Sequence, residues 1–332
     1  MKASLVRLAL LLLLCTAGTA ARADDQIVGS AILPQTERGV FTRDGRYFVA
    51  SALGIDEVKR TPDSSPGCVR DPLESLTVCR MVEPRLLGRP CLFTGMTTDG
   101  TFLYAVCTIA ASPLAIEDAA LFRIRPARRG PAGRSRTTEV TSRRFASPTF
   151  YNGMTALDSR TLLLTDTSAS ALLLGLGKPA VVKLTITDPA TLRFDVAPWL
   201  ASSPLFIAPN GIARDGAFVY FVGGQNLFRI PLRADHSAGT PVLIYQTLPT
   251  QLLDDLAPVG DRIAVAEIAI VNGLGLNGVT LVAKSGIGLP RHIATGLTQL
   301  SDVDVDRGSI IPGGGLIGTS FFQGGVYQLG RP

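Results

Sequence analysis

A short motif recurs six times along the chain and constrains the fold more than any other feature. Each copy joins a small or polar residue, an apolar step, an Asp-containing turn and a strand-forming run. The copies begin at Gly39, Thr94, Asn152, Asn210, Asp254 and Ser301, separated by 55, 58, 58, 44 and 47 residues. One propeller blade takes about 40 to 50 residues. We therefore predict an all-β fold, a six-bladed β-propeller with four-stranded antiparallel blades around a central channel.

The remaining sequence agrees with an all-β fold. No long segment has a helical period, and short apolar runs alternate with clusters of Gly, Asp, Pro and Asn. A β-sandwich or an irregular all-β fold is the alternative, but it gives no reason for similar lead positions at comparable intervals. In a propeller these positions converge around the mouth of the channel. The strand expected at 326–329 could close the ring by pairing with one at 27–32, which would protect both sheet edges.

The first 23 residues have the pattern of a secretory signal peptide. Lys2 and Arg7 precede an apolar core at 8–14, and small residues surround a cleavage site after Ala23. This core is much shorter than the roughly 20 residues that span a bilayer, so no transmembrane segment is expected. Cys15 follows leucines instead of a small residue, which disfavours a lipoprotein. We expect a cleaved signal peptide at 1–23 and a single propeller at 24–332, in a secreted or periplasmic protein.

Charge argues against a nucleic-acid partner. The full chain has a formal charge of +5, and loss of Lys2, Arg7 and Arg22 with the signal peptide lowers it to +2. The basic segment at 123–136 is rich in Pro and Gly and has no interleaved aromatic residues. A solvated loop is therefore favoured over a nucleic-acid surface.

Four cysteines remain after the expected cleavage: Cys68, Cys79, Cys91 and Cys107. An even count in an exported chain favours disulfides, and four cysteines allow three pairings. Cys91 and Cys107 flank two strand-like runs around an Asp-Gly turn, which would bring them opposite each other. We therefore expect Cys68–Cys79 and Cys91–Cys107. The spacing of the cysteines is unlike that of a zinc site.

The repeats supply an oxygen-rich set of side chains. Taking Glu37 for the first repeat, the lead residues are Glu37, Thr94, Asn152, Asn210, Asp254 and Ser301. Two carboxylates and two amides suit a hard cation such as Ca²⁺, which takes six to eight oxygen ligands. The two histidines, His236 and His292, lie in loop contexts, which argues against a His-rich metal centre or a Ser-His-Asp triad. Taken alone, Asn210 with its following glycine is also a common turn pair.

Three segments resemble a known family. The segments 'ERGVFTRDGRYFVA', 'APNGIARDGAFVY' and 'LLDDLAP' resemble the E-G-P-x-W…DG, PNG…DG-apolar-Y and PDG-apolar patterns of the senescence marker protein/gluconolactonase (regucalcin-like) family. The resemblance spans most of residues 24–332. It implies a propeller that holds one divalent cation on Glu37, Asn210 and Asp254, with Asn152 beside the metal and in contact with substrate or water. It also implies hydrolysis of sugar lactones.

The chain departs from the family pattern in three blades. Phe150 stands where sugar-acid lactonases carry the Arg of R-x-N-D, so a carboxylate or polyhydroxy substrate loses a cationic contact. Arg38 and a glycine replace Gly-Pro in the first blade, and Asp254-Asp255 replaces Asp-Gly in the fifth. Either aspartate could be the ligand, and position favours Asp254. With Phe150 and Tyr151 near the mouth, we expect a more hydrophobic substrate than a sugar acid.

These inferences predict an exported, metal-dependent hydrolase of lactones or esters, with Ca²⁺ as the expected ion. The cation would polarise the substrate carbonyl and lower the pKa of a bound water, and Asp254 is the candidate general base. The alternative is a non-catalytic secreted propeller that binds a protein or small ligand at its top face, because a propeller ion can also serve structure alone.

Overall fold

The computed structural model describes residues 25–71, 76–112, 115–126, 138–169, 178–269, 277–295, 297 and 299–330. The expected signal peptide at 1–23 and most of the basic segment at 123–136 lie outside these ranges. Almost all regular structure is β-strand, and the 3-10 turn η1 (Thr167–Ala169) is the short exception within the described chain. No helix among the described residues is long and apolar enough to cross a membrane.

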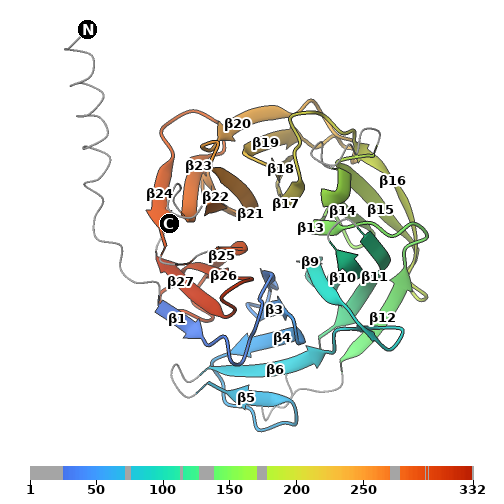
Figure 1. The fold of residues 1–332 in the computed structure, drawn as a ribbon, viewed down its shortest axis with the longest axis vertical. Helices are drawn as coiled ribbons and strands as arrows, with labels where there is room; N and C mark the ends of the chain where they lie inside the picture. Colours follow the sequence, from blue (N-terminus) through green and yellow to red (C-terminus); the bar gives the residue numbers. More distant parts are fainter. Residues whose placement is uncertain are drawn as a thin grey trace, which may run out of the picture.

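Six antiparallel sheets surround a common axis as blades (Figure 1). The first blade has the order β2-β3-β4-β6-β5, with β2 (Arg38–Phe41), β3 (Tyr47–Ser51), β4 (Gly54–Lys59), β5 (Cys68–Arg70) and β6 (Thr77–Val82). Its short fifth strand is an addition to the expected four. A hairpin of β7 (Arg85–Leu86) and β8 (Arg89–Pro90) follows this blade.

The next four blades each run from the innermost to the outermost strand in chain order. The second has β9 (Leu92–Thr98), β10 (Leu103–Ser112), β11 (Ala115–Arg125) and β12 (Glu139–Arg144). The third has β13 (Tyr151–Ala156), β14 (Thr161–Asp166), β15 (Val181–Asp188) and β16 (Arg193–Leu200). The fourth has β17 (Pro209–Asp215), β18 (Phe218–Gly223), β19 (Asn226–Pro231) and β20 (Val242–Gln246). The fifth has β21 (Gln251–Val259), β22 (Arg262–Ala269), β23 (Gly278–Ala283) and β24 (Arg291–Ala294).

The sixth blade combines both ends of the described chain. It has β25 (Asp302–Asp306), β26 (Gly315–Thr319), β27 (Val326–Gly330) and, as its outermost strand, β1 (Asp25–Val28). Figure 1 shows the blue β1 beside the red β27, and the two strands pair antiparallel with Gln26 opposite Tyr327. The ring closes by this pairing, which the sequence had left open. The closing strand ends earlier than expected because the Ile32 amide donates to the Gly29 carbonyl, 3.0 Å away, in a turn.

The fold confirms the six-bladed propeller predicted from the repeats. The innermost strands β2, β9, β13, β17, β21 and β25 contact one another in succession and complete a ring. Hydrophobic clusters lie between adjacent blades; one joins Phe48 of β3 to Phe93 of β9 and Phe122 of β11. Each blade packs against a neighbouring blade on both of its faces. The inner strands of a blade therefore carry apolar residues on both faces.

The glycines that follow the lead residues Thr94, Asn152 and Asn210 lie in strands, not in turns. A Cβ atom added to Gly153 would lie 2.2 Å from the carbonyl oxygen of Asn210, and one added to Gly95 would lie 2.3 Å from that of Asn152. Neither glycine has a positive φ. These glycines therefore allow adjacent inner strands to approach closely. Gly216, in the Asp-Gly turn, does have a positive φ of 57°, as a blade turn requires.

Replacement of Gly153 by alanine should destabilise the ring, because the new methyl group meets a backbone carbonyl that has no freedom to rotate away. Overpacking of this kind costs about 1 to 3 kcal/mol. Urea unfolding of the variant measures the loss. Gly216→Ala is the control, since no atom lies within 4 Å of its added Cβ and only the backbone strain of a positive φ remains. Equal stability of Gly153→Ala and the wild type would show that the strands can separate without cost.

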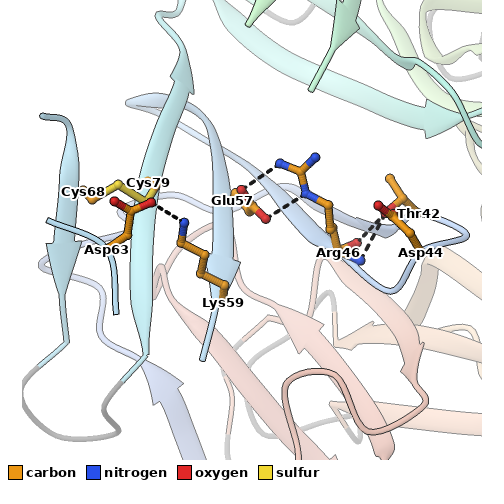
Figure 2. A network of polar contacts seen from close by, with 8 residues as sticks. All are labelled: Thr42, Asp44, Arg46, Glu57, Lys59, Asp63, Cys68 and Cys79. Carbon is orange, nitrogen blue, oxygen red and sulfur yellow. Dashed lines mark hydrogen bonds and ion pairs between the residues drawn. A yellow bond between two sulfur atoms is a disulfide. The ribbon is translucent and has the colours of Figure 1, made fainter. Parts of the chain in front are cut away.

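The two expected disulfides are confirmed. Cys68 and Cys79 are direct cross-strand partners on β5 and β6, and Cys91 lies just before β9, bonded to Cys107 on β10. Figure 2 shows buried ion pairs beside the first disulfide. Lys59 lies 2.5 Å from Asp63, and Arg46 makes two contacts of 2.8 Å with Glu57. Covalent and ionic links thus join strands of the first blade.

Candidate functional site

A cavity of about 390 Å³ lies at the end of the ring where the inner strands begin. Five of the six lead residues line it: Glu37, Thr94, Asn152, Asn210 and Asp254. Each stands at or beside the start of an inner strand, so the repeat places one such residue per blade around the axis. Ser301, the sixth, does not line the cavity. It is buried, and its Oγ accepts a hydrogen bond of 2.8 Å from the Phe321 amide.

Glu37, Asn210 and Asp254 form the acidic side of this cavity. The side-chain amide of Asn210 donates a hydrogen bond to Oδ1 of Asp254. This leaves the carbonyl oxygen of Asn210 and a second carboxylate oxygen of Asp254 for other ligands. The Glu37 carboxylate makes no hydrogen bond or ion pair with any residue in the described ranges. An unpaired carboxylate beside a second one is costly in a protein unless a cation or a proton joins them.

The electrostatic environment indicates that these acids resist ionisation without a cation. Burial raises the pKa of Asp254 to about 7, with a further rise from Asp302 and an opposing effect of the Asn210 hydrogen bond. Burial also raises the pKa of Glu37 well above its usual range, and the charges of Asp254 and Asp302 add to this. A divalent cation would supply the missing positive charge. Two carboxylates and an amide carbonyl match the oxygen ligands that Ca²⁺ takes, so the residues present fit that ion.

The two adjacent aspartates of β21 face different partners. Asp254 lines the cavity, whereas Asp255 pairs through Oδ2 with the guanidinium of Arg38. Oδ1 of Asp255 also accepts a hydrogen bond of 2.7 Å from the Leu256 amide. With both carboxylate oxygens engaged, Asp255 has less capacity to bind an ion than Asp254.

Arg38 connects three blades, a role that the sequence analysis missed. It lies on β2 of the first blade, reaches Asp255 of the fifth, and donates from Nε to the Met96 carbonyl of the second at 3.1 Å. Its side chain is 12% exposed and that of Asp255 is 5% exposed. The signal for this pair was present in the sequence as two departures from the family pattern. The added Arg in one blade compensates the added Asp in another.

A second group of acids lies along β25. Oδ2 of Asp302 accepts a hydrogen bond of 2.6 Å from the Gly39 amide, which joins the innermost strands of the sixth and first blades. Burial raises the pKa of Asp302 and raises that of Asp304 to about 7. Asp306 belongs to the blade turn, where it accepts hydrogen bonds from the amides of residues 308–311.

The two aromatic residues expected at the mouth lie on different sides. Phe150 lines the cavity. Tyr151 does not: its ring packs against Phe145 between blades, with ring centroids 4.7 Å apart, beside a separate cavity of about 430 Å³. The placement of Tyr151 at the mouth is therefore corrected. Successive residues entering a strand point to opposite sides, so Phe150 and Tyr151 could not share one face.

The neutral and apolar wall of the cavity was also missed by the sequence analysis. It includes Leu92, Leu252, Ile268, Gln299 and Phe321. Leu252 and Ile268 are direct cross-strand partners on β21 and β22, so strand pairing could have linked them once the blade was known. The only cluster of three acids or cysteines with metal-binding spacing in the described chain is Asp63, Cys68 and Cys79, where both sulfurs form the disulfide. Neither His236 nor His292 lines the cavity.

Comparisons with known proteins show which structures this chain resembles. The chain matches no family model and no curated protein sequence. It is similar to a gluconolactonase structure from Xanthomonas campestris, at 14% identity and a TM-score of 0.52, over 94% of this chain and 99% of that one. It is also similar to a Thermus thermophilus structure described as a putative oxidoreductase (glucose dehydrogenase), at 14% identity and a TM-score of 0.54, over 93% and 99% of the two chains.

A further match extends over only part of a longer protein. The chain spans 40% of the length of an extracellular domain of a two-component system from B. thetaiotaomicron, and 93% of this chain is covered at 11% identity and a TM-score of 0.49. The sequence identity of all these matches is low. What the gluconolactonase and Thermus thermophilus structures share with this chain is the fold.

Proposed function

We propose that this chain is a divalent-metal-dependent hydrolase of lactones or esters, with Ca²⁺ held by Glu37, Asn210 and Asp254. The observation that carries the proposal is the convergence of these three residues on one cavity, where the Glu37 carboxylate is unpaired and the pKa of Asp254 is about 7. Buried carboxyl groups with a shifted pKa are a recurrent property of functional sites.

The chemistry divides between the ion and the side chains. When bound, a divalent cation polarises the substrate carbonyl and lowers the pKa of a water ligand. Asp254 accepts the proton from the attacking water, and the Asn210 amide orients its carboxylate through the hydrogen bond to Oδ1. Asn152, on the same cavity wall, holds the substrate carbonyl or the water. The apolar wall binds the rest of the substrate and excludes bulk water.

The cavity wall favours a less polar substrate than a sugar acid. Phe150 lines the cavity at the position where a sugar-acid lactonase would carry Arg, and no Lys or Arg is among the described residues that line it. An anionic substrate would find no cationic side chain there. Alkyl lactones or esters are therefore the preferred class.

Export is part of the proposal. The sequence pattern of residues 1–23 and the two disulfides both agree with a secreted or periplasmic protein, since disulfides persist in oxidising compartments. The catalytic unit would be the propeller of residues 24–332, with a small-molecule substrate and no nucleic-acid partner.

Chelation should abolish hydrolysis. We expect the exported protein to open alkyl-substituted γ-lactones, to lose more than about nine-tenths of this activity in EGTA, and to regain it with Ca²⁺, because the ion supplies the Lewis acid. Product formation by chromatography and the Ca²⁺-dependent rise in Tm are the two measurements. Full activity in EGTA would contradict the metal site. A rise in Tm with Ca²⁺ but no hydrolysis of any lactone or ester would favour the non-catalytic binding propeller.

A further inference from the structure

A second cavity lies apart from the proposed metal site. We call it the outer groove: it has a volume of about 430 Å³ and is lined by residues 143–147 and 194–196 and by Tyr151, from the second and third blades. None of these residues lines the cavity that contains Glu37 and Asp254. The proposed hydrolysis makes no use of this space, although its volume lies within the range of small-molecule sites, about 300 to 1,000 Å³.

Three aromatic rings form the apolar part of the outer groove. The ring centroid of Phe145 lies 4.7 Å from that of Tyr151 and 5.1 Å from that of Phe194. Phe145 and Tyr151 are buried and form the floor, whereas Phe194 on β16 is half-buried and open to a ligand. Val196, on the same face of β16, is 41% exposed. A flat ring therefore finds an accessible apolar wall in this groove.

A cationic side chain faces this wall. Arg143 is exposed and lies opposite Leu121 in the pairing of β11 with β12. Paired residues share one side of a sheet, and Leu121 packs in the same cluster as Phe194 between the two blades. Arg143 therefore projects toward the third blade, and it lines the groove. Its guanidinium makes no hydrogen bond or ion pair with any residue that the structure describes.

The neighbouring charged residues do not neutralise Arg143. Successive side chains alternate along a strand, so Arg144 takes the other face of β12, where its guanidinium is 2.8 Å from Asp118. Asp195 also lines the groove, but the same alternation on β16 directs its carboxylate away from the face that carries Phe194. The groove thus combines an unpaired positive charge with an aromatic wall.

We propose that the outer groove binds a small aromatic carboxylate. The carboxylate pairs with the guanidinium of Arg143, whose planar fork matches two carboxylate oxygens. The ring of the ligand packs against Phe194 and Val196, since aromatic pairs gain more than their buried area alone supplies. This site is separate from the metal cavity, so the proposal does not depend on the hydrolase function.

Binding of cinnamate, measured by ligand-observed NMR in EGTA, tests the proposal. EGTA removes Ca²⁺, so an ion at Glu37 and Asp254 cannot hold the carboxylate. We expect a Kd of about 1 mM, which is typical of so small a ligand at an open site. Cinnamamide keeps the shape without the charge, and acetate keeps the charge without the ring. Each should bind about tenfold more weakly.

Two variants locate the binding in the groove. Arg143→Gln should weaken cinnamate binding about tenfold and leave cinnamamide binding unchanged, because only the carboxylate loses its partner. Phe194→Leu keeps an apolar side chain without the ring and should weaken both ligands about threefold. The matched control is Arg160→Gln, at an exposed position between β13 and β14 that does not line the groove, and it should bind cinnamate like the wild type.

Four results would overturn the proposal. Equal binding of cinnamate and cinnamamide would remove the role of the charge, and equal binding of acetate would remove the role of the ring. Unchanged cinnamate binding in Arg143→Gln would place the ligand elsewhere. Loss of cinnamate binding in Asp254→Asn would place it in the metal cavity. Absence of any lactone or ester hydrolysis, by contrast, would refute the hydrolase and leave the expected cinnamate binding as it is.

Discussion

Replacement of Asp254 by alanine should lower lactone or ester hydrolysis by about a hundredfold to ten-thousandfold, the range that a positioned general base contributes. The same change removes one proposed ligand of the ion, so the Ca²⁺ concentration needed to raise Tm should also increase. Steady-state rates and thermal shifts at several Ca²⁺ concentrations measure the two effects. Because Asp254 is buried with a pKa of about 7, its removal should not destabilise the metal-free protein.

Two further variants sharpen this result. Asp254→Asn keeps the shape of the side chain and an oxygen for the Asn210 amide, so it should fold normally while losing activity. Asp215→Asn is the control, since Asp215 lies in a blade turn and pairs with Lys284. It should keep activity within about twofold, as surface substitutions usually do. If Asp254→Ala retained more than a tenth of the wild-type rate, the base would have to be sought elsewhere on the cavity wall.

Replacement of Arg38 by methionine should be the most destabilising single change in the ring. It leaves the buried carboxylate of Asp255 without its cation and removes the hydrogen bond from Arg38 to the Met96 carbonyl. Breaking one side of a buried ion pair costs about 3 to 5 kcal/mol. Chemical denaturation of wild type and variant gives the difference, with unchanged m-values as the sign that both unfold between the same states.

A double-mutant cycle tests whether the loss arises from the pair. Arg38→Met combined with Asp255→Asn removes both charges, so the double variant should be more stable than Arg38→Met alone. Additive losses would mean that the two residues act independently. A loss below about 1 kcal/mol for Arg38→Met, the range of exposed ion pairs, would mean that water reaches the pair.

The fold was predictable from the repeats because each copy contains the turn and strand signals of one blade. The Asp-containing turns and the apolar runs define a blade locally, and the number of repeats at comparable intervals then sets the number of blades. The disulfides were predictable for the same reason, since Cys91 and Cys107 flank one hairpin. Contacts inside one hairpin can be inferred from spacing along the chain.

Contacts across the ring axis could not be inferred in this way. Arg38 and Asp255 are 217 residues apart and meet only because the ring is closed. Taken separately, each looked like a defect in a family pattern. Gln299 and Phe321 lie outside the repeated positions, so no periodicity marked them. Tyr151 was misplaced because one residue decides which side of a strand a side chain takes.

Closure of the ring must also wait for synthesis of the chain, because it joins the first strand to the last. Gln26 and Tyr327 are separated by 301 residues, so β1 waits for its partner until almost the whole chain has been synthesised. At about 5 to 20 residues per second this wait lasts about 15 to 60 seconds. The equilibrium cost of so long a loop is small, since each doubling adds only about 0.6 kcal/mol. The delay is instead a kinetic hazard: until β1 and β27 meet, each leaves a sheet edge to which a neighbouring nascent chain can add.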